Sequence, residues 1–260
     1  MSIIDVSWEV KTDYTRSLAK KGVREDKRKN DEYRKIKLEK NYVPNSPGSA
    51  LVTIGDTKVL AGVSLVMGTP YPDKPAAGTL MTSVELTPMA SPLFESGPPR
   101  PNAVELARVV DRGIRESGTI DFEKLCITPE EAVWMVIVDL HALDYDGNLF
   151  DAFSLAAISA LLDAKMPKYE DGKVIREETA GKLPVTKKPI ECTSVKIGDS
   201  IMLDPTLAEE MALDARLTVS TLDKTICAMQ KGGTGAFTLK EVDDLIDLSF
   251  KKGKELRKLL

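Results

Sequence analysis

Hydrophobic and polar positions along the chain predict two β-hairpins of the same kind. Residues 49–68, SALVTIGDTKVLAGVSLVMG, are β-branched and apolar on both sides of a Gly-Asp pair, which predicts a hairpin that turns at this pair. Residues 192–206, CTSVKIGDSIMLDPT, predict a second hairpin with the turn I-G-D-S, close to the I-G-D-T of the first. We interpret the recurring turn as a sign that the chain has two related halves.

The remaining pattern predicts further strands and several helices. Strands are expected at TLMTSVELT, VWMVIVDLHAL and the pair ARLTVSTLDKTICAMQKGG. Helices are expected at ELARVVDRGIRES and at DAFSLAAISALLDA, whose small residues suit close packing, and a short helix is expected at TPEEA with Thr128 as its N-cap. A Thr238–Glu241 capping box predicts the start of a final helix with an apolar face.

Strands followed by helices, twice, favour an α+β fold of two related halves over a doubly wound parallel sheet. The prediction divides the chain into a charged helical arm, a first half, a charged linker that contains Pro and Gly, and a second half: residues 1–30, 31–165, 166–190 and 191–260.

Composition limits the classes of function. The net charge of −4 over 260 residues excludes a strongly basic field over the whole protein, so a nucleic-acid site has to be a local patch. Three cysteines, far apart and without a C-x-x-C pair, argue against a disulfide framework and a structural zinc site. No apolar run approaches the ~20 residues that span a bilayer, so we expect a cytoplasmic protein without a membrane partner.

Three arginines in the predicted helix at residues 105–117 form the main candidate binding site. Arg108, Arg112 and Arg115 are spaced four and then three residues apart, which places them on one stripe of a helix. Such a stripe is either a solvated face or a surface for an anion, and the planar guanidinium suits phosphate. The spacing alone leaves both interpretations open.

For the other residues of catalytic or ligand-binding type, a structural role is favoured over a chemical one. His141 lies on an apolar strand without a nucleophile motif, and DYDGN at 144–148 lacks the Gly and Glu positions of a calcium loop. The glycine-rich KGGTGAF at 231–237 fits neither phosphate-loop motif. We predict no metal site here.

An acidic cluster in the second half has two interpretations. Asp204, Glu209, Glu210 and Asp214 could form paired carboxylates for acid–base chemistry or metal binding. The segment DPTLAEE also predicts a turn and a short helix with a Thr206–Glu209 capping box. The structural interpretation is favoured, and the chemical one stays open.

Several segments together resemble the RNase PH family. GVREDKRKNDEYR resembles the R-x-D-x-R opening of that family, with Arg24, Asp26 and Arg28 at its fixed positions. ELARVVDRGIRES, DYDGNLFDAFSLAAISALLDA, DPTLAEE and KGGTG follow in the family's order, so the resemblance covers essentially the whole chain. It implies the RNase PH-like fold (ribosomal protein S5 domain 2-like). Within the family the chain most resembles the non-catalytic ring subunit of the archaeal exosome.

The chain departs from the catalytic members of that family at three places. Where they carry an Arg-Arg pair before the helix glutamate, this chain has Pro101 and Asn102. Their phosphate-binding Gly-Ser-Arg matches Asn148, Leu149 and Phe150, and their two aspartates, six residues apart, match Glu210 and Arg216. Phosphorolysis needs a bound phosphate and a positioned acid. The resemblance therefore predicts a catalytically silent chain, with no catalytic residues.

The resemblance also assigns partners. It implies a trimer of heterodimers with a catalytic RNase PH-like subunit, RNA-binding cap subunits on the ring, and single-stranded RNA degraded in the 3′→5′ direction. It implies that Arg108, Arg112 and Arg115 contact the RNA backbone, with Arg100 a weaker candidate. No cofactor is expected, because the partner's site uses the inorganic phosphate. The segment with Arg24, Asp26 and Arg28 is expected to serve structure or the subunit interface.

Two alternatives remain. The chain could be an active phosphate-dependent exoribonuclease of the RNase PH type if Asp204 or Asp214 were the acid, although Phe150 argues against a phosphate site. It could also be an RNA-binding module unconnected to degradation, which the presence of a ring-forming partner would exclude.

Overall fold

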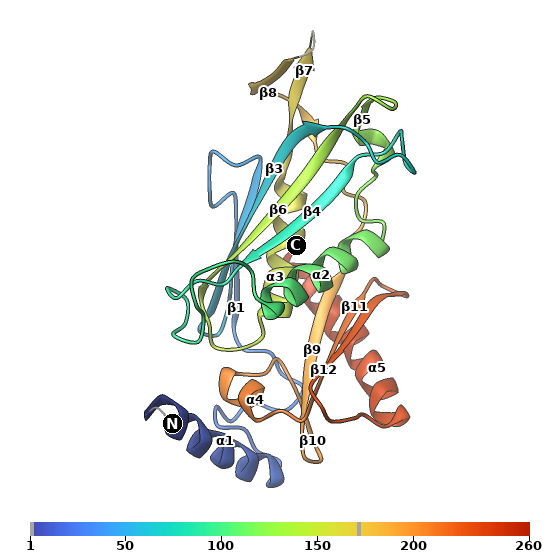
Figure 1. Cartoon of the computed structure of the whole chain (residues 1–260). Helices are drawn as coiled ribbons and strands as arrows, with labels where there is room; N and C mark the ends of the chain where they lie inside the picture. The colour runs from blue at the N-terminus through green and yellow to red at the C-terminus, as the bar shows by residue number, and fades with distance from the viewer. Residues whose placement is uncertain (1–2, 171–172) are drawn as a thin grey trace.

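Two lobes, each built on its own β-sheet, make up the computed structural model, which describes residues 3–170 and 173–260 (Figure 1). The first lobe contains a six-stranded sheet with the order β1-β2-β3-β6-β4, and β5 pairs with β6 outside this path. The strands are β1 (Ile36–Lys40), β2 (Gly48–Ile54), β3 (Thr57–Gly68), β4 (Thr79–Glu85), β5 (Cys126–Thr128) and β6 (Ala132–Asp144). All pairs are antiparallel except β4 with β6.

The second lobe contains a four-stranded antiparallel sheet with the order β10-β9-β11-β12. Its strands are β9 (Ile190–Ile197), β10 (Ser200–Leu203), β11 (Ala215–Thr221) and β12 (Ile226–Gly232). The two predicted hairpins are confirmed, and they have the same turn. Ile54 pairs with Thr57 and Ile197 with Ser200, while Gly55 and Gly198 adopt φ values of 59° and 60°. A positive φ is the reason that glycine stands at both turns.

Helix α3 (Leu149–Asp163) lies at the centre of the molecule and contacts both lobes. Every residue from Leu149 to Leu161 is buried, because α3 packs on β2 and β3 with one side and on β9 with another. A helix that is apolar all round is typical of such a position. At Gly48 on β2 the helix comes so near that a Cβ atom would lie 2.3 Å from the carbonyl oxygen of Ala160.

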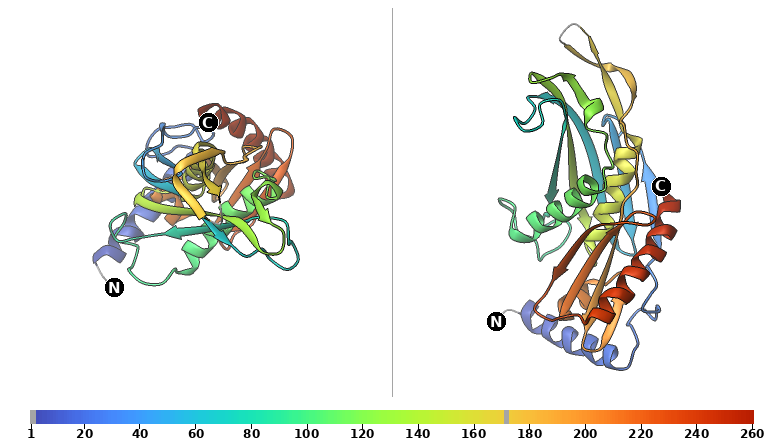
Figure 2. Two further views of the ribbon diagram at one scale, coloured as in Figure 1. Left: turned by 90° about the horizontal axis from the view of Figure 1, so that it is seen from above. Right: turned by 90° about the vertical axis from the view of Figure 1, so that its right-hand side faces the viewer.

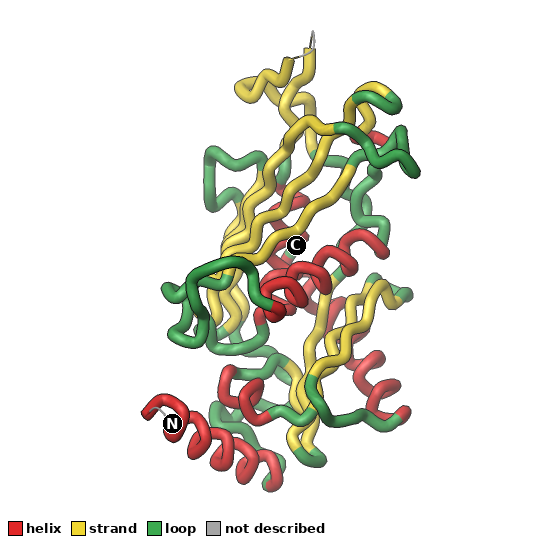
Figure 3. The backbone as a smooth tube through the Cα atoms, in the orientation of Figure 1, coloured by secondary structure: helices red, strands yellow, loops and turns green. Residues whose placement is uncertain are grey.

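Besides α3, the described chain contains four α-helices and two short 3-10 helices. Figure 3 shows how the helices are distributed around the sheets. Helix α1 and helix α4 contact each other at the base of the second lobe, and α5 covers β9 and β11. The Thr206–Glu209 and Thr238–Glu241 capping boxes that the sequence predicts are both present at α4 and α5. The elements are α1 (Ile3–Lys20), α2 (Pro101–Glu116), α4 (Leu207–Ala212), α5 (Leu239–Leu256), η1 (Glu123–Leu125) and η2 (Arg257–Leu259).

Helix α2, which carries the arginine stripe, lies between the two sheets. It contacts β4 of the first sheet, β12 of the second sheet, and α3 (Figure 1). Its apolar side, which includes Leu106, Val110 and Ile114, is buried in the main core. Gly113 lets the helix approach β9, because a Cβ atom there would lie 2.8 Å from Oε1 of the buried Glu191.

Two local predictions were wrong. The segment TPEEA forms no helix, because Pro129 and Glu130 make the turn of a β5–β6 hairpin, in which the amide of Glu131 donates to the carbonyl of Thr128 at 3.1 Å. Glu130 has a φ of 68°, as the third position of a type II turn requires. The β-branched run that follows the turn favours a strand over a helix.

The expected linker at 166–190 is also more ordered than predicted. It contains most of a two-stranded hairpin formed by β7 (Lys165–Glu170) and β8 (Lys173–Lys182). This hairpin extends from one end of the molecule, opposite to the end at which α1 lies (Figure 2). Met166, Tyr169 and Val174 lie between its charged residues and pack on the main core, so the charge of the segment was not a sign of a loop.

A buried ion-pair network joins the segment after α1 to the second lobe. Arg24 donates from Nε to Oε1 of Glu209 at 2.8 Å, and both side chains are almost completely buried. Arg28 and Arg34 both pair with Asp204, at 3.0 and 2.8 Å. Burial raises the pKa of Asp204, but the hydrogen bonds and charge of Arg34 outweigh it and lower this pKa below its usual value. The R-x-D-x-R segment therefore has a structural role within the chain.

No described helix combines the length and the apolar character that crossing a membrane requires.

Candidate RNA interface

Arg108 and Arg112 lie on the exposed side of α2. Neither forms a salt bridge or a side-chain hydrogen bond with the residues that the structure describes. Both line an open groove between α2 and the edge of the second sheet, together with Glu105 and Gln230. The groove therefore presents two guanidinium groups that are available to an anionic ligand.

Arg115 differs from the other two arginines of the stripe. Its Nε and Nη2 donate to the two carboxylate oxygens of Asp111, at 3.0 and 3.1 Å, and Nη2 also donates to the carbonyl of Leu80 at 2.9 Å. The side chain is 41% exposed but is directed toward β4. The sequence places the three arginines on one stripe, and the structure leaves only two of them without partners among the described residues.

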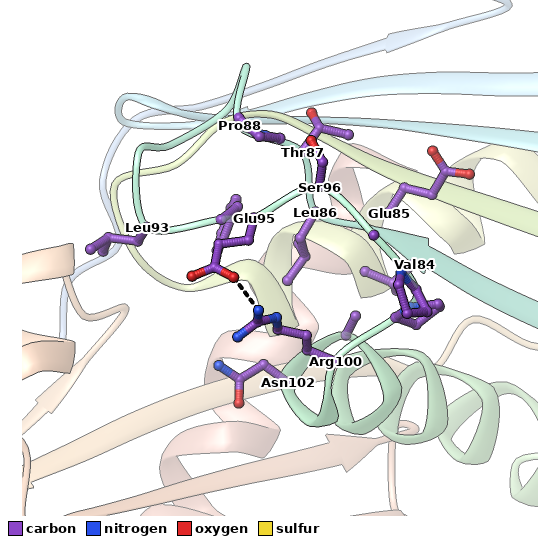
Figure 4. Close-up of a pocket in the computed structure, with 15 residues that line it drawn as sticks. Val84, Glu85, Leu86, Thr87, Pro88, Leu93, Glu95, Ser96, Arg100 and Asn102 are labelled. Atoms are coloured by element: carbon purple, nitrogen blue, oxygen red, sulfur yellow. Dashed lines mark hydrogen bonds and ion pairs between the residues drawn. The ribbon is translucent and has the colours of Figure 1, made fainter.

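Arg100 lies at the N-terminus of α2, beside a pocket of about 390 Å³. It pairs with Glu95, and this exposed ion pair lies at the side of the pocket (Figure 4). The pocket is lined by the end of β4 and by the loop that leads to α2. Arg100 therefore already has an acidic partner, which Arg108 and Arg112 lack among the described residues.

Phe150 and Arg216, which the resemblance places opposite functional residues of catalytic family members, contact each other. The guanidinium carbon of Arg216 lies 4.1 Å from the centroid of the Phe150 ring, which is a cation–π contact. Nη2 of Arg216 also donates to Oε1 of Glu105 at 2.6 Å. Gly232, which pairs with Arg216 across β11 and β12, leaves room for this guanidinium, because a Cβ atom would lie 2.7 Å from Nη2.

Glu210, which the resemblance matches to the first of the family's two aspartates, is also engaged within the chain. Its Oε2 accepts from the Tyr145 hydroxyl at 2.5 Å, and its Oε1 accepts from the amide of Asn148 at 2.9 Å. Burial raises the pKa of Glu210, and burial next to Glu210 raises the pKa of Tyr145 well above its usual value. Asp214, the last acid of the cluster, pairs with Arg16 at 2.8 Å.

The other candidates take structural positions. His141 lies on β6 with its Nδ1 3.4 Å from Glu85 on the neighbouring strand. Asn148, the last residue of DYDGN, is the N-cap of α3 in a left-handed conformation. Among the described residues, no group of three or more His, Cys, Asp or Glu side chains is arranged to hold a metal ion.

Two contributors to this surface were not predicted from the sequence. Gln230 lines the groove from β12 and donates from Nε2 to Oε1 of Glu105 at 3.2 Å. Gly232 makes room for Arg216. The only signal in the sequence was their place in the predicted strand pair, which does not indicate that β12 lies beside α2.

Comparison with known families decides the classification. Residues 32–167 match the 3′ exoribonuclease family, domain 1 (RNase PH), and residues 188–252 match domain 2 of the same family. The chain belongs to the RNase PH family. The predicted family and its α+β fold are therefore confirmed.

Curated members of the family from archaea are similar over their whole length. The chain is 49% identical to "Exosome complex component Rrp42" of Methanocella arvoryzae, over 98% of this chain and 97% of the relative. It is 47% identical to the protein of the same name from Thermococcus gammatolerans, over 100% and 97%.

Solved structures of the family have the same architecture. A chain of the Archaeoglobus fulgidus exosome with RNA bound to the active site matches with a TM-score of 0.92 and 44% identity, over 97% of this chain and 98% of that chain. A chain of an archaeal exosome core matches with a TM-score of 0.89 and 41% identity, over 99% and 98%.

Proposed function

We propose that this protein is a non-catalytic subunit of an archaeal exosome ring, which scaffolds the ring and binds RNA during 3′→5′ phosphorolytic degradation. The similarity to archaeal exosome components extends over nearly the whole chain, which supports a role in the same kind of assembly. The RNA-bound exosome of A. fulgidus supports RNA as the ligand.

The contact between Phe150 and Arg216 carries the proposal that the chain is catalytically silent. By resemblance, Phe150 stands where catalytic members hold phosphate with an arginine, and Arg216 stands where they have an aspartate. Here the ring faces the guanidinium at 4.1 Å, and the same guanidinium pairs with Glu105. The two side chains contact each other, and neither supplies the phosphate ligand or the acid that phosphorolysis needs.

Arg108 and Arg112 carry the proposal for RNA binding. They are exposed, and they line the same groove. Guanidinium groups bind phosphate oxygens through charge-assisted hydrogen bonds, which read the backbone and not the bases. Arg115 belongs to the same proposed site but is held by Asp111, so we expect it to contribute less.

The proposed assembly is a trimer of heterodimers with a catalytic RNase PH-like subunit, and RNA-binding cap subunits lie on the ring. In this assembly the inorganic phosphate is bound by the partner's site, and this chain needs no cofactor of its own. Its role is to complete the RNA path into the partner's active site.

Phosphate-dependent shortening of an end-labelled single-stranded RNA tests the proposal. We expect no shortening by this chain alone, and with the catalytic subunit we expect a higher rate than that subunit shows alone. Shortening by this chain alone would support the alternative, an active exoribonuclease of the RNase PH type. A mixture no faster than the partner alone would contradict the role in completing the partner's site.

A further inference from the structure

We infer that Arg216 and Gln230 are positioning residues for RNA binding, because they hold the Glu105 carboxylate away from Arg108. This inference rests on the proposed contact between Arg108 and RNA. It means that the contacts of Arg216 and Gln230 with Glu105, where α2 meets the second sheet, affect RNA binding.

Two acidic residues of α2, Glu105 and Asp111, lie three positions from Arg108, and Asp111 is already paired with Arg115. Glu105 precedes Arg108 by three residues, and side chains at this spacing are neighbours on a helix surface. A free carboxylate there would pair with Arg108 and reduce the positive charge that the groove offers to phosphate. Glu105 and Arg108 both line this groove, so the two side chains share one surface.

Two donors from the second sheet engage this carboxylate instead. Arg216 on β11 donates to Oε1 of Glu105 at 2.6 Å, and Gln230 on β12 donates to the same oxygen at 3.2 Å. The Arg216 side chain is only 16% exposed, so water screens this ion pair less than a pair at the surface.

Arg216 is itself fixed in the orientation that this contact needs. The Phe150 ring supports one face of its guanidinium, and Gly232 leaves space beside it. Arginine is pre-organised for such a contact because its guanidinium is planar. The arrangement therefore keeps the Glu105 charge next to the second sheet, and Arg108 stays without a partner among the described residues.

The test measures RNA affinity at several salt concentrations for the ring assembled with its catalytic partner. We expect Arg216→Gln to lower the affinity about two- to fivefold, because only the weaker, neutral donor Gln230 then competes with Arg108 for Glu105. We expect Glu105→Gln in the Arg216→Gln background to restore the affinity. Glu105→Gln alone should leave the affinity nearly unchanged, since Arg216 already engages this carboxylate.

Three results would overturn the inference. The first is an Arg216→Gln ring with unchanged affinity, although Arg108→Gln weakens binding. The second is a double variant no better than Arg216→Gln, which would indicate a structural role only. The third is a gain in affinity from Glu105→Gln alone that equals the loss from Arg216→Gln, which would indicate an effect of net charge.

Two further variants keep the test decisive. Lys196→Gln breaks a partly buried ion pair with Glu241 elsewhere in the same lobe and should leave RNA affinity unchanged. If the Arg216→Gln chain does not assemble, Gln230→Ala makes the same test with a smaller expected loss. An Arg108→Gln ring with unchanged affinity would instead contradict the proposed RNA contact itself.

Discussion

Arg115 donates two hydrogen bonds to Asp111, one turn earlier on the same helix, while Arg108 and Arg112 have no such partner among the described residues. The three arginines of the stripe are therefore not equivalent. An arginine that is already paired has to give up its partner before it binds phosphate, and it contributes less to the affinity.

This difference predicts the salt dependence of RNA binding. Arg108→Gln and Arg112→Gln should each reduce the slope of log K against log salt by about 0.7, the value for one phosphate contact on a single strand. Arg115→Gln should change the slope less. Titration of the assembled ring with labelled single-stranded RNA checks this, and equal effects of all three variants would contradict it.

Replacing one partner of the buried pair of Arg24 and Glu209 should cause a large loss of stability. Arg24→Met leaves the Glu209 carboxylate buried without its partner, so the free energy of unfolding should fall by about 3–5 kcal/mol. The double variant with Glu209→Gln should recover part of this loss, because no unpaired charge is then buried. Urea unfolding measures both, and a double variant less stable than Arg24→Met would contradict this explanation.

Asp151 predicts how stability depends on pH. Burial raises the pKa of this carboxyl to about 6, although hydrogen bonds from Asn148, Tyr33 and Thr193 oppose the shift. The folded state therefore binds the proton more tightly than the unfolded state, so this contribution to stability is present at low pH and is lost as the pH rises through about 4 to 6.

Asp151→Asn removes this titration. From pH 4 to pH 7 the wild type should lose roughly 2–3 kcal/mol relative to the Asp151→Asn variant. Urea unfolding of both proteins at a series of pH values measures the difference, in which the contributions of other groups largely cancel. A constant difference would show that the pKa of Asp151 is not raised.

A side chain at Gly147 should cause a steric clash in addition to backbone strain. The φ of Gly147 is 86°, and a Cβ atom would lie 2.4 Å from the backbone carbon of Thr206. Gly147→Ala should therefore destabilise the chain by more than about 2 kcal/mol, since a left-handed alanine alone costs roughly 1–2 kcal/mol. Gly22→Ala is the control, because Gly22 has a φ of 69° with open space around it. Equal losses of stability would contradict the steric explanation.

The local elements of the fold were predictable where short-range chemistry decides them. The two I-G-D hairpins, the strand at VWMVIVDLHAL and both capping boxes depend on turn residues, alternation and capping side chains within a few positions. The helix predicted at TPEEA was wrong because the same Thr-Pro pair suits both a helix start and a type II turn. The β7–β8 hairpin was missed because its charge suggested a loop.

By itself, then, the sequence determined the hairpins, the helices, the family resemblance and the stripe of three arginines, because each depends on neighbours along the chain. Tertiary structure alone decided which arginines have no partner among the described residues and where the Glu105 charge lies. Arg216 is 111 residues from Glu105, and the two meet only because α2 packs against the edge of the second sheet. Local spacing carries no information about such a contact, since it depends on how distant elements pack.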